Sequence, residues 1–194
     1  MICNQHVTPL KKIYLEESRA IRENPGSYNT LSLRQKLQKL INDKASKLVF
    51  RNALGTLEYK LSGGSNKPLK YFLMTIEYYY QWYQSGAKGT PSCIDKSRIY
   101  DFAGTSIEHI YPQKADIKDE NLEPLINTLG NLTILDPAQN TIASNDAFEA
   151  KKTLFQQSSV ELTRNIGKKQ AWTEQEVENH KNMLIDIALK VFYP

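Results

Sequence analysis

The residues best suited to chemistry in this sequence are an acid and a histidine that stand side by side, Glu108 and His109. They follow an alternating apolar run in the segment I-E-H-I-Y-P-Q, residues 107–113, and the chain contains 3 histidines in all. An imidazole has an ordinary pKa of about 6.5, so at cellular pH it offers a neutral nitrogen that can accept a proton. Such a pair is most simply explained as an exposed strand residue beside a surface imidazole, so its meaning depends on the residues further along the chain.

Two asparagines come after the pair at a spacing of nine residues, Asn131 and Asn140. The pattern around them predicts a strand at residues 106–111, a loop, a second strand at residues 129–135, and a short helix at residues 136–140. In a regular strand, successive side chains point to opposite faces. Glu108 and His109 therefore share a site only if the strand ends or twists near Pro112.

The remainder of the chain is predicted to be mainly helical. Helices are expected at residues 8–23, about residues 33–41, residues 48–61 with a break near Gly55, residues 68–86, from residue 144 through 155, and over the last 35 or so residues. The helix at residues 68–86 is aromatic on all sides, which favours a central core helix over a platform that stacks on nucleic-acid bases. We expect Trp172 in the core and His180 on the solvent face of the last helix.

The composition is that of a globular protein without a membrane span or signal peptide, which we interpret as a soluble, cytoplasmic chain. Its 2 cysteines cannot form a four-cysteine zinc site. The net charge of +4 is divided unevenly, because residues 1–100 carry a balance of +9 and residues 101–194 a balance of −5. The basic half is the candidate for phosphate contact, with an ordinary solvated helical surface as the alternative. Its candidate DNA-binding residues are Arg34, Lys36, Lys39, Lys44, Lys47 and Arg51.

The motif residues together resemble the HNH, or ββα-metal, nuclease motif. They are similar to the HNH domain of RNA-guided CRISPR nucleases. A closer resemblance is to the nuclease domain at the C-terminal end of GmrSD-type modification-dependent restriction enzymes and related phosphorothioate-sensing defence proteins. The segments that carry it are residues 107–113, residues 129–135, Asn140, residues 144–148, and Lys151 or Lys152. The resemblance is dense over residues 106–155 and looser out to Trp172.

The resemblance implies an α+β fold, mainly α-helical, with a β-hairpin plus helix as the nuclease core. We expect a basic helical region at residues 1–87 and the nuclease region at residues 88–194. His109 would be the general base, and Asn131 would pin the loop and orient the His109 ring. Glu108 and Asn140 would supply hard oxygen ligands for Mg²⁺ or Mn²⁺.

Three further residues are weaker candidates. Asn145 is a reserve metal ligand, with helix capping as its competing explanation. Lys151 and Lys152 are candidates for phosphate contact, although lysines on a surface helix are usually only solvated.

The expected function is that of a metal-dependent DNA endonuclease, nicking DNA in a bacterial restriction or anti-phage defence system. Two alternatives remain open, a catalytically inactive HNH-like module that binds DNA or a partner, and an RNase. The resemblance also implies a sensor domain or partner protein with nucleotide-dependent activity. The sequence itself has no G-x-x-x-x-G-K-[ST] loop for binding nucleotide phosphates.

Overall fold

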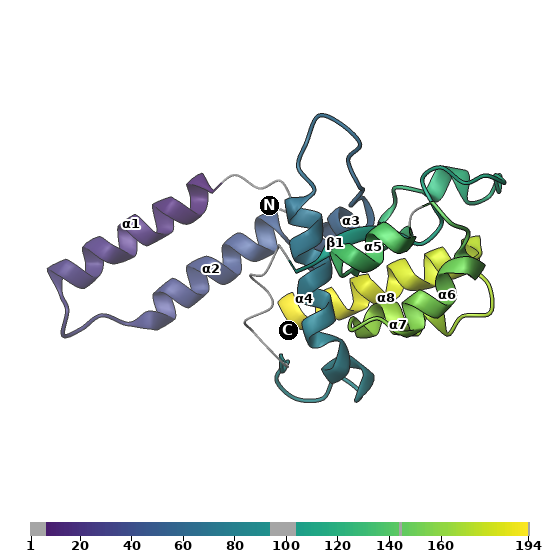
Figure 1. The fold of residues 1–194 in the computed structure, drawn as a ribbon. Coiled ribbons are helices and arrows are strands. Elements are labelled where there is room, and N and C mark those ends of the chain that lie inside the picture. Colours follow the sequence, from purple (N-terminus) through teal and green to yellow (C-terminus); the bar gives the residue numbers. More distant parts are fainter. Residues whose placement is uncertain (1–6, 94–103, 144, 194) are drawn as a thin grey trace. The chain divides into compact units, whose positions relative to one another are not determined.

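The computed structural model describes residues 7–93, 104–143 and 145–193 (Figure 1). In chain order, the elements are α1 (Thr8–Glu23), α2 (Thr30–Lys44), α3 (Lys47–Gly55), α4 (Lys67–Gln84), β1 (Ser106–His109), η2 (Glu123–Leu125), η3 (Leu129–Asn131), β2 (Leu132–Leu135), α5 (Pro137–Ala143), α6 (Phe148–Gln156), α7 (Glu161–Gly167) and α8 (Glu174–Phe192). The predicted class, mainly helical α+β with a β-hairpin, is confirmed. No helix in these described ranges is long and apolar enough to cross a membrane.

The chain forms two compact units, Met1–Leu54 and Gly55–Pro194. The division therefore falls earlier than the boundary that we expected at residues 87/88. The reason lies in α4, which packs against α7 and α8 and so belongs to the second unit.

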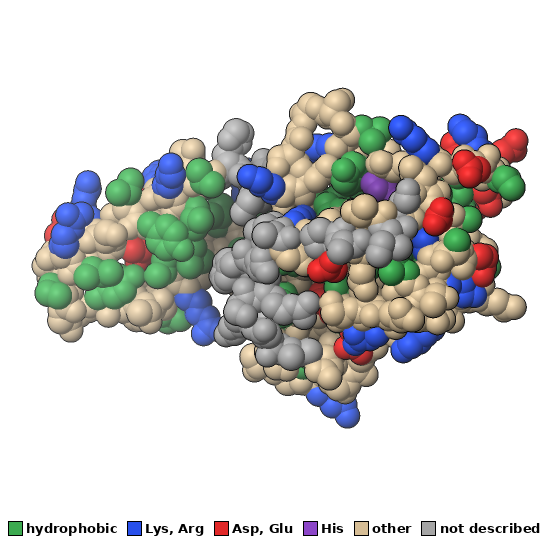
Figure 2. Space-filling view, viewed as in Figure 1, with side chains coloured by type: hydrophobic (Ala, Val, Ile, Leu, Met, Phe, Trp, Pro, Cys, Tyr) green, Lys and Arg blue, Asp and Glu red, His purple; other side chains and the backbone are tan. Residues whose placement is uncertain are grey.

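The first unit contains the paired helices α1 and α2. Lys36 of α2 lies 2.8 Å from the carboxylate of Glu17 and 3.3 Å from that of Glu16, both on α1. Tyr28, in the connection, donates to Glu17 at 2.6 Å. The hydrogen bond from Lys36 is the main reason that the pKa of Glu17 is lowered. Figure 2 shows hydrophobic side chains on the surface of this unit, and its exposed large hydrophobic residues include Tyr14, Leu15 and Leu31.

The second unit is built around α4, whose aromatic residues Tyr78, Tyr80 and Trp82 are buried. This confirms the core interpretation of the aromatic run. The carboxylate of Glu77 accepts hydrogen bonds from the first backbone N–H groups of α7, and Tyr83 donates to Asp186 on α8 at 2.9 Å. These polar contacts hold α7 and α8 against the C-terminal half of α4.

Strands β1 and β2 pair antiparallel, with Glu108 opposite Thr133 and His109 opposite Leu132. Both strands are shorter than predicted. Residues 129–131 form the 3-10 turn η3, and the side chain of Asn131 bonds to the N–H and carbonyl of Tyr111, which a longer ladder would otherwise pair. The antiparallel pair therefore ends at His109, where the chain turns toward Tyr111 and Pro112.

Two sequence predictions in this unit are wrong. Residues 57–61 do not continue a helix beyond Gly55; they run beside residues 127–129, with Tyr59 N–H donating to the Asn127 carbonyl at 2.8 Å. His180 does not face solvent, since its ring is buried, packs on Trp172 and lies 3.2 Å from the Leu132 carbonyl. In both cases a tertiary contact overrides the local pattern.

Candidate active site

His109 is the last residue of β1, and three side chains surround its ring. Its Nε2 lies 3.2 Å from the amide oxygen of Asn127 and 3.2 Å from the amide nitrogen of Gln113. The Tyr59 ring meets it edge-on, with 4.7 Å between the ring centroids. With 8% of the residue exposed, the imidazole is held in one orientation at the edge of the core.

The His109 ring is neutral at cellular pH. Burial lowers its pKa to about 4, and the positive charge of Lys151 acts in the same direction, while the hydrogen bond to Asn127 opposes them. A ring with this pKa keeps an unprotonated nitrogen from neutral pH down into the acidic range. The environment therefore preserves the form that a general base requires.

The contact with Asn127 favours one tautomer of that ring. An amide oxygen only accepts, so a proton on Nε2 of His109 satisfies it and leaves Nδ1 with the free lone pair. The Gln113 amide nitrogen lies 3.5 Å from the same Asn127 oxygen and can donate to it as well. The 3.2 Å contact from the Gln113 amide nitrogen to Nε2 of His109 requires the opposite tautomer, because that nitrogen only donates.

Glu108 belongs to a buried ion pair. Its carboxylate lies 2.6 Å from Nζ of Lys151 on α6, and the same ammonium donates to the His109 carbonyl at 2.9 Å. Burial raises the pKa of Glu108, while the charge of Lys151 lowers it. The structure thus differs from two expectations, because Lys151 is no surface phosphate contact and the Glu108 carboxylate is engaged with an ammonium. Strand alternation explains the placement, since neighbours on β1 face opposite sides.

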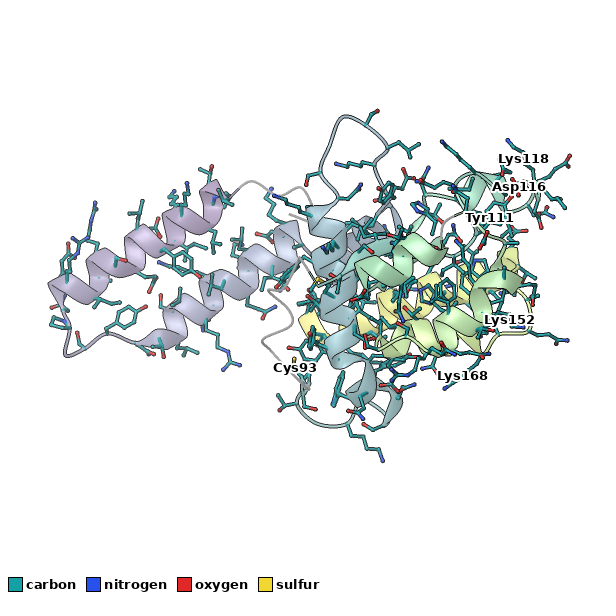
Figure 3. The ribbon with its side chains drawn as sticks, in the orientation of Figure 1. Cys93, Tyr111, Asp116, Lys118, Lys152 and Lys168 are labelled. Atoms are coloured by element: carbon teal, nitrogen blue, oxygen red, sulfur yellow. The ribbon has the colours of Figure 1, made fainter. Side chains whose placement is uncertain are left out.

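Asn131 bonds to the loop after β1, and none of its hydrogen bonds within the described ranges reaches the His109 ring. Its amide oxygen accepts from Tyr111 N–H at 2.8 Å and from the Trp172 indole at 3.0 Å. Its amide nitrogen donates to the carbonyls of Tyr111 and Ile126, each at 2.9 Å. Both ends of the amide are therefore committed to the scaffold, and the contact with the ring is made by Asn127 and Gln113. Tyr111 itself is labelled in Figure 3.

Asn140 lies on α5, beside β1. Its amide nitrogen donates to the Ile107 carbonyl at 2.9 Å. This hydrogen bond fixes the plane of the amide and therefore the direction of its oxygen. Asn140 also lines a cavity of about 990 Å³, together with Tyr59, Asn66, Lys67, Lys70, Thr105, Ser106, Ile107 and Thr141. Tyr59 connects this cavity to the His109 ring.

The two other candidates near the motif have ordinary surroundings. Asn145 is exposed, and the residue that caps α6 is Ala147 rather than Asn145. Lys152 pairs with Glu149 at 3.3 Å and donates to the Gln170 carbonyl at 3.1 Å (Figure 3). The surroundings of Asn145 and Lys152 therefore give no support to a metal or phosphate role for either residue.

The six basic candidates lie on α2 and α3. Lys36 is engaged by Glu16 and Glu17, and Lys39 lies 3.8 Å from Asp43. The other four, Arg34, Lys44, Lys47 and Arg51, are exposed. Their contact with DNA stays a prediction.

The oxygen donors present suit a hydrated cation better than a closed metal site. Within the described ranges, no group of three or more His, Cys, Asp or Glu side chains is placed to hold a metal ion. Mg²⁺ usually keeps several waters and binds through one or two protein oxygens together with substrate phosphates. The amide oxygen of Asn140, beside the cavity, fits that pattern. The carboxylate of Glu108 fits it less well, because Lys151 already neutralises it.

Sequence reasoning missed Asn127 and Tyr59 and left Gln113 without a role. Gln113 follows His109 by four residues inside the motif, and that proximity was the available signal. Asn127 and Tyr59 come to the ring through the isolated pairing of Glu58 with Thr128. A long-range pairing of this kind leaves no periodic pattern in the sequence.

Two comparisons with known proteins bear on the family of this chain. A comparison with individual curated proteins found no match. The family model described as "GmrSD restriction endonucleases, C-terminal domain" matches residues 44–187, which include α4, both strands, the His109 surroundings and most of α8. With most of its length matched, the chain belongs to the family of GmrSD restriction endonuclease C-terminal domains.

Proposed function

We propose that this chain is a metal-dependent DNA endonuclease of a bacterial restriction or anti-phage defence system, with His109 as its general base. The observation that carries the proposal is the neutral His109 ring, held by Asn127 at the end of β1 and in contact with Tyr59, which lines a cavity of about 990 Å³. Membership of a restriction endonuclease family makes DNA the substrate to test first.

The proposed reaction is hydrolysis of a phosphodiester bond. The neutral ring of His109 takes a proton from a water molecule, which attacks the phosphorus as the bond to the leaving 3′ oxygen breaks. Asn127 holds the ring and accepts from Nε2–H, so the imidazolium formed stays in place. Mg²⁺ or Mn²⁺, held by the amide oxygen of Asn140 and by phosphate oxygens, would supply stabilisation of the negative charge.

The direct test is a time course on supercoiled plasmid with Mg²⁺ or Mn²⁺, comparing the wild type with His109→Ala and with the control Lys168→Ala. Loss of a general base typically slows a reaction by about 10²–10⁴-fold. We expect that loss for His109→Ala and unchanged cleavage for Lys168→Ala. Cleavage within a few-fold of wild type by His109→Ala would remove the ring from the mechanism.

Two alternatives are separated by the same assay. A catalytically inactive binding module would leave the plasmid intact with every metal tested while still binding it. An RNase would cut a labelled RNA and spare the plasmid. We expect DNA cleavage that stops when EDTA is added.

Nicked plasmid should appear before linear plasmid, because one histidine centre cuts one strand at a time. We further propose that targeting comes from a sensor domain or partner with nucleotide-dependent activity. End-mapping of the products tests this second point, and clean site-specific fragments from this chain alone would contradict it.

A further inference from the structure

The cavity beside Asn140 has a positively charged wall at the beginning of α4. Lys67 and Lys70 both line it, and their spacing of three residues puts them on one face of the helix. Lys67 is exposed and Lys70 is half-buried. The described lining residues include these two cations and no acidic side chain. The described lining of this cavity therefore carries positively charged side chains on α4.

The loop before α4 is fixed, which keeps the two lysines in place. The Asn66 side chain accepts from Lys60 N–H at 2.8 Å and donates to the Lys60 carbonyl at 2.9 Å. Lys67 N–H is capped by the Ser65 hydroxyl at 3.2 Å. The charged wall thus begins at a closed loop rather than a frayed end.

The opposite wall belongs to the candidate active site. Ser106 and Ile107 come from β1, shortly before His109 in the chain, while Asn140 and Thr141 come from α5. Tyr59 lines the cavity and also touches the His109 ring. The cavity is therefore lined both by the lysines of α4 and by Tyr59, whose ring contacts the imidazole of His109.

We propose that the cavity holds the sugar–phosphate backbone of the strand being cut, and that Lys67 and Lys70 bind the phosphates next to the scissile one. The inference rests on the proposed nuclease function and names its substrate contacts. Contacts of this kind position a strand and read no base sequence. They lie within the second unit and are separate from the six basic candidates of α2 and α3.

The test measures DNA binding by the non-cleaving His109→Ala protein over a range of salt concentrations, using a fluorescent duplex. Removing one phosphate contact should reduce the slope of log K against log salt by about 0.9. We expect a reduction of about 0.9 for Lys67→Ala and about 1.8 for Lys67→Ala with Lys70→Ala. Lys168→Ala, whose residue follows α7 and does not line the cavity (Figure 3), should leave the slope unchanged.

A second arm measures cleavage in the same lysine variants with His109 intact. We expect KM to rise and kcat to change little, with Lys67→Arg close to wild type. Thermal melting of each variant checks folding, and Lys67→Ala alone keeps the test decisive if the double variant is unstable, because Lys67 is exposed.

The outcomes separate the two proposals. A wild type that cleaves, with lysine variants that keep its slope and KM, would overturn the cavity assignment and leave the nuclease function standing. A wild type that never cleaves, with lysine variants that still have a reduced slope, would overturn the nuclease function and keep the cavity as a binding site. A reduced slope only on neutralising Arg34, Lys44, Lys47 and Arg51 would move the DNA contact to the first unit.

Discussion

The amide oxygen of Asn127 lies 3.2 Å from Nε2 of His109, although 18 residues separate the two in the chain. The contact orients the ring, and the Gln113 amide nitrogen lies near both Nε2 of His109 and the Asn127 oxygen. The histidine therefore depends on a partner that no local pattern identifies. Substitution of Asn127 tests that dependence directly.

Asn127→Ala should lower kcat by roughly 10–100-fold, a range typical of partners that orient an essential histidine. Asn127→Asp should instead raise the pKa of His109, because a carboxylate stabilises the imidazolium. The acidic limb of the pH–rate profile should then move to higher pH. Gln113→Ala is the matched control and should change the limb less. Identical profiles for all three variants would show that Asn127 does not act on the ring.

Acid should destabilise the fold through His109 and His180. Burial lowers both pKa values to about 4 from the ordinary 6.5. The unfolded chain therefore binds protons as pH falls through 6.5, while the folded chain resists until about pH 4. Stability is complete above pH 6.5 and is lost between these values, by on the order of 3 kcal/mol per histidine.

Urea unfolding at pH 7.5 and pH 4.5 measures that loss. His180→Gln should remove its own share of the pH dependence, about half of the total from the two rings. The comparison uses the difference between the two pH values, so a uniform loss of stability does not obscure it. An unchanged pH dependence in His180→Gln would show that the ring is not buried in its neutral form.

Lys151→Met should destabilise the protein by about 3–5 kcal/mol, because it leaves the buried carboxylate of Glu108 without its cation. The double variant with Glu108→Gln should recover part of that loss. Chemical denaturation of the two single variants and the double variant gives the coupling energy. Additive losses would mean that the 2.6 Å pair does not form.

The same variants bear on the metal. Glu108→Gln should lower stability more than it changes the Mg²⁺ concentration needed for half-maximal cleavage. Asn140→Ala should do the reverse, because its amide oxygen lies beside the cavity. A large rise in the Mg²⁺ requirement of Glu108→Gln would restore this carboxylate to the metal site.

Asn131→Leu should lower the free energy of unfolding by at least about 3 kcal/mol. It leaves backbone groups of Tyr111 and Ile126 and the Trp172 indole N–H without their hydrogen-bond partner. Asn131→Asp keeps the acceptor for Tyr111 N–H and for the indole but sets a carboxylate oxygen against the carbonyls of Tyr111 and Ile126, so it should also destabilise the protein. Thermal or urea unfolding ranks the two. Equal stability of Asn131→Leu and wild type would contradict the pinning role.

The parts of the molecule that the sequence predicts are those with a local signal. Helix α1 has its Pro9 start and its end at Glu23 as expected, and the pairing of β1 with β2 is consistent with alternation and the motif. Residues 57–61 were missed because a helical spacing of leucines continues past Gly55, while the actual partner is 70 residues away at Thr128. Local periodicity carries no information about such a partner.

The candidate site divides in the same way. His109 and Asn140 stand out by type and spacing, and strand alternation made a shared site for Glu108 and His109 depend on the strand ending or twisting near Pro112. The identity of the cation that neutralises Glu108 depends on how α6 packs, which the pattern around Lys151 does not reveal. The sequence alone does not distinguish a buried lysine on a helix from an exposed one.

Trp172 anchors Asn131 and His180 anchors Leu132, so the turn beside the site depends on residues that are synthesised after it. A ribosome releases His109, Asn127 and Asn140 well before it releases α8. The nascent chain then holds every proposed catalytic group but lacks the indole and helix that close the turn at η3. Because chains are synthesised from the N-terminus at about 5–20 residues per second, the site is completed only seconds after Asn140 has been added.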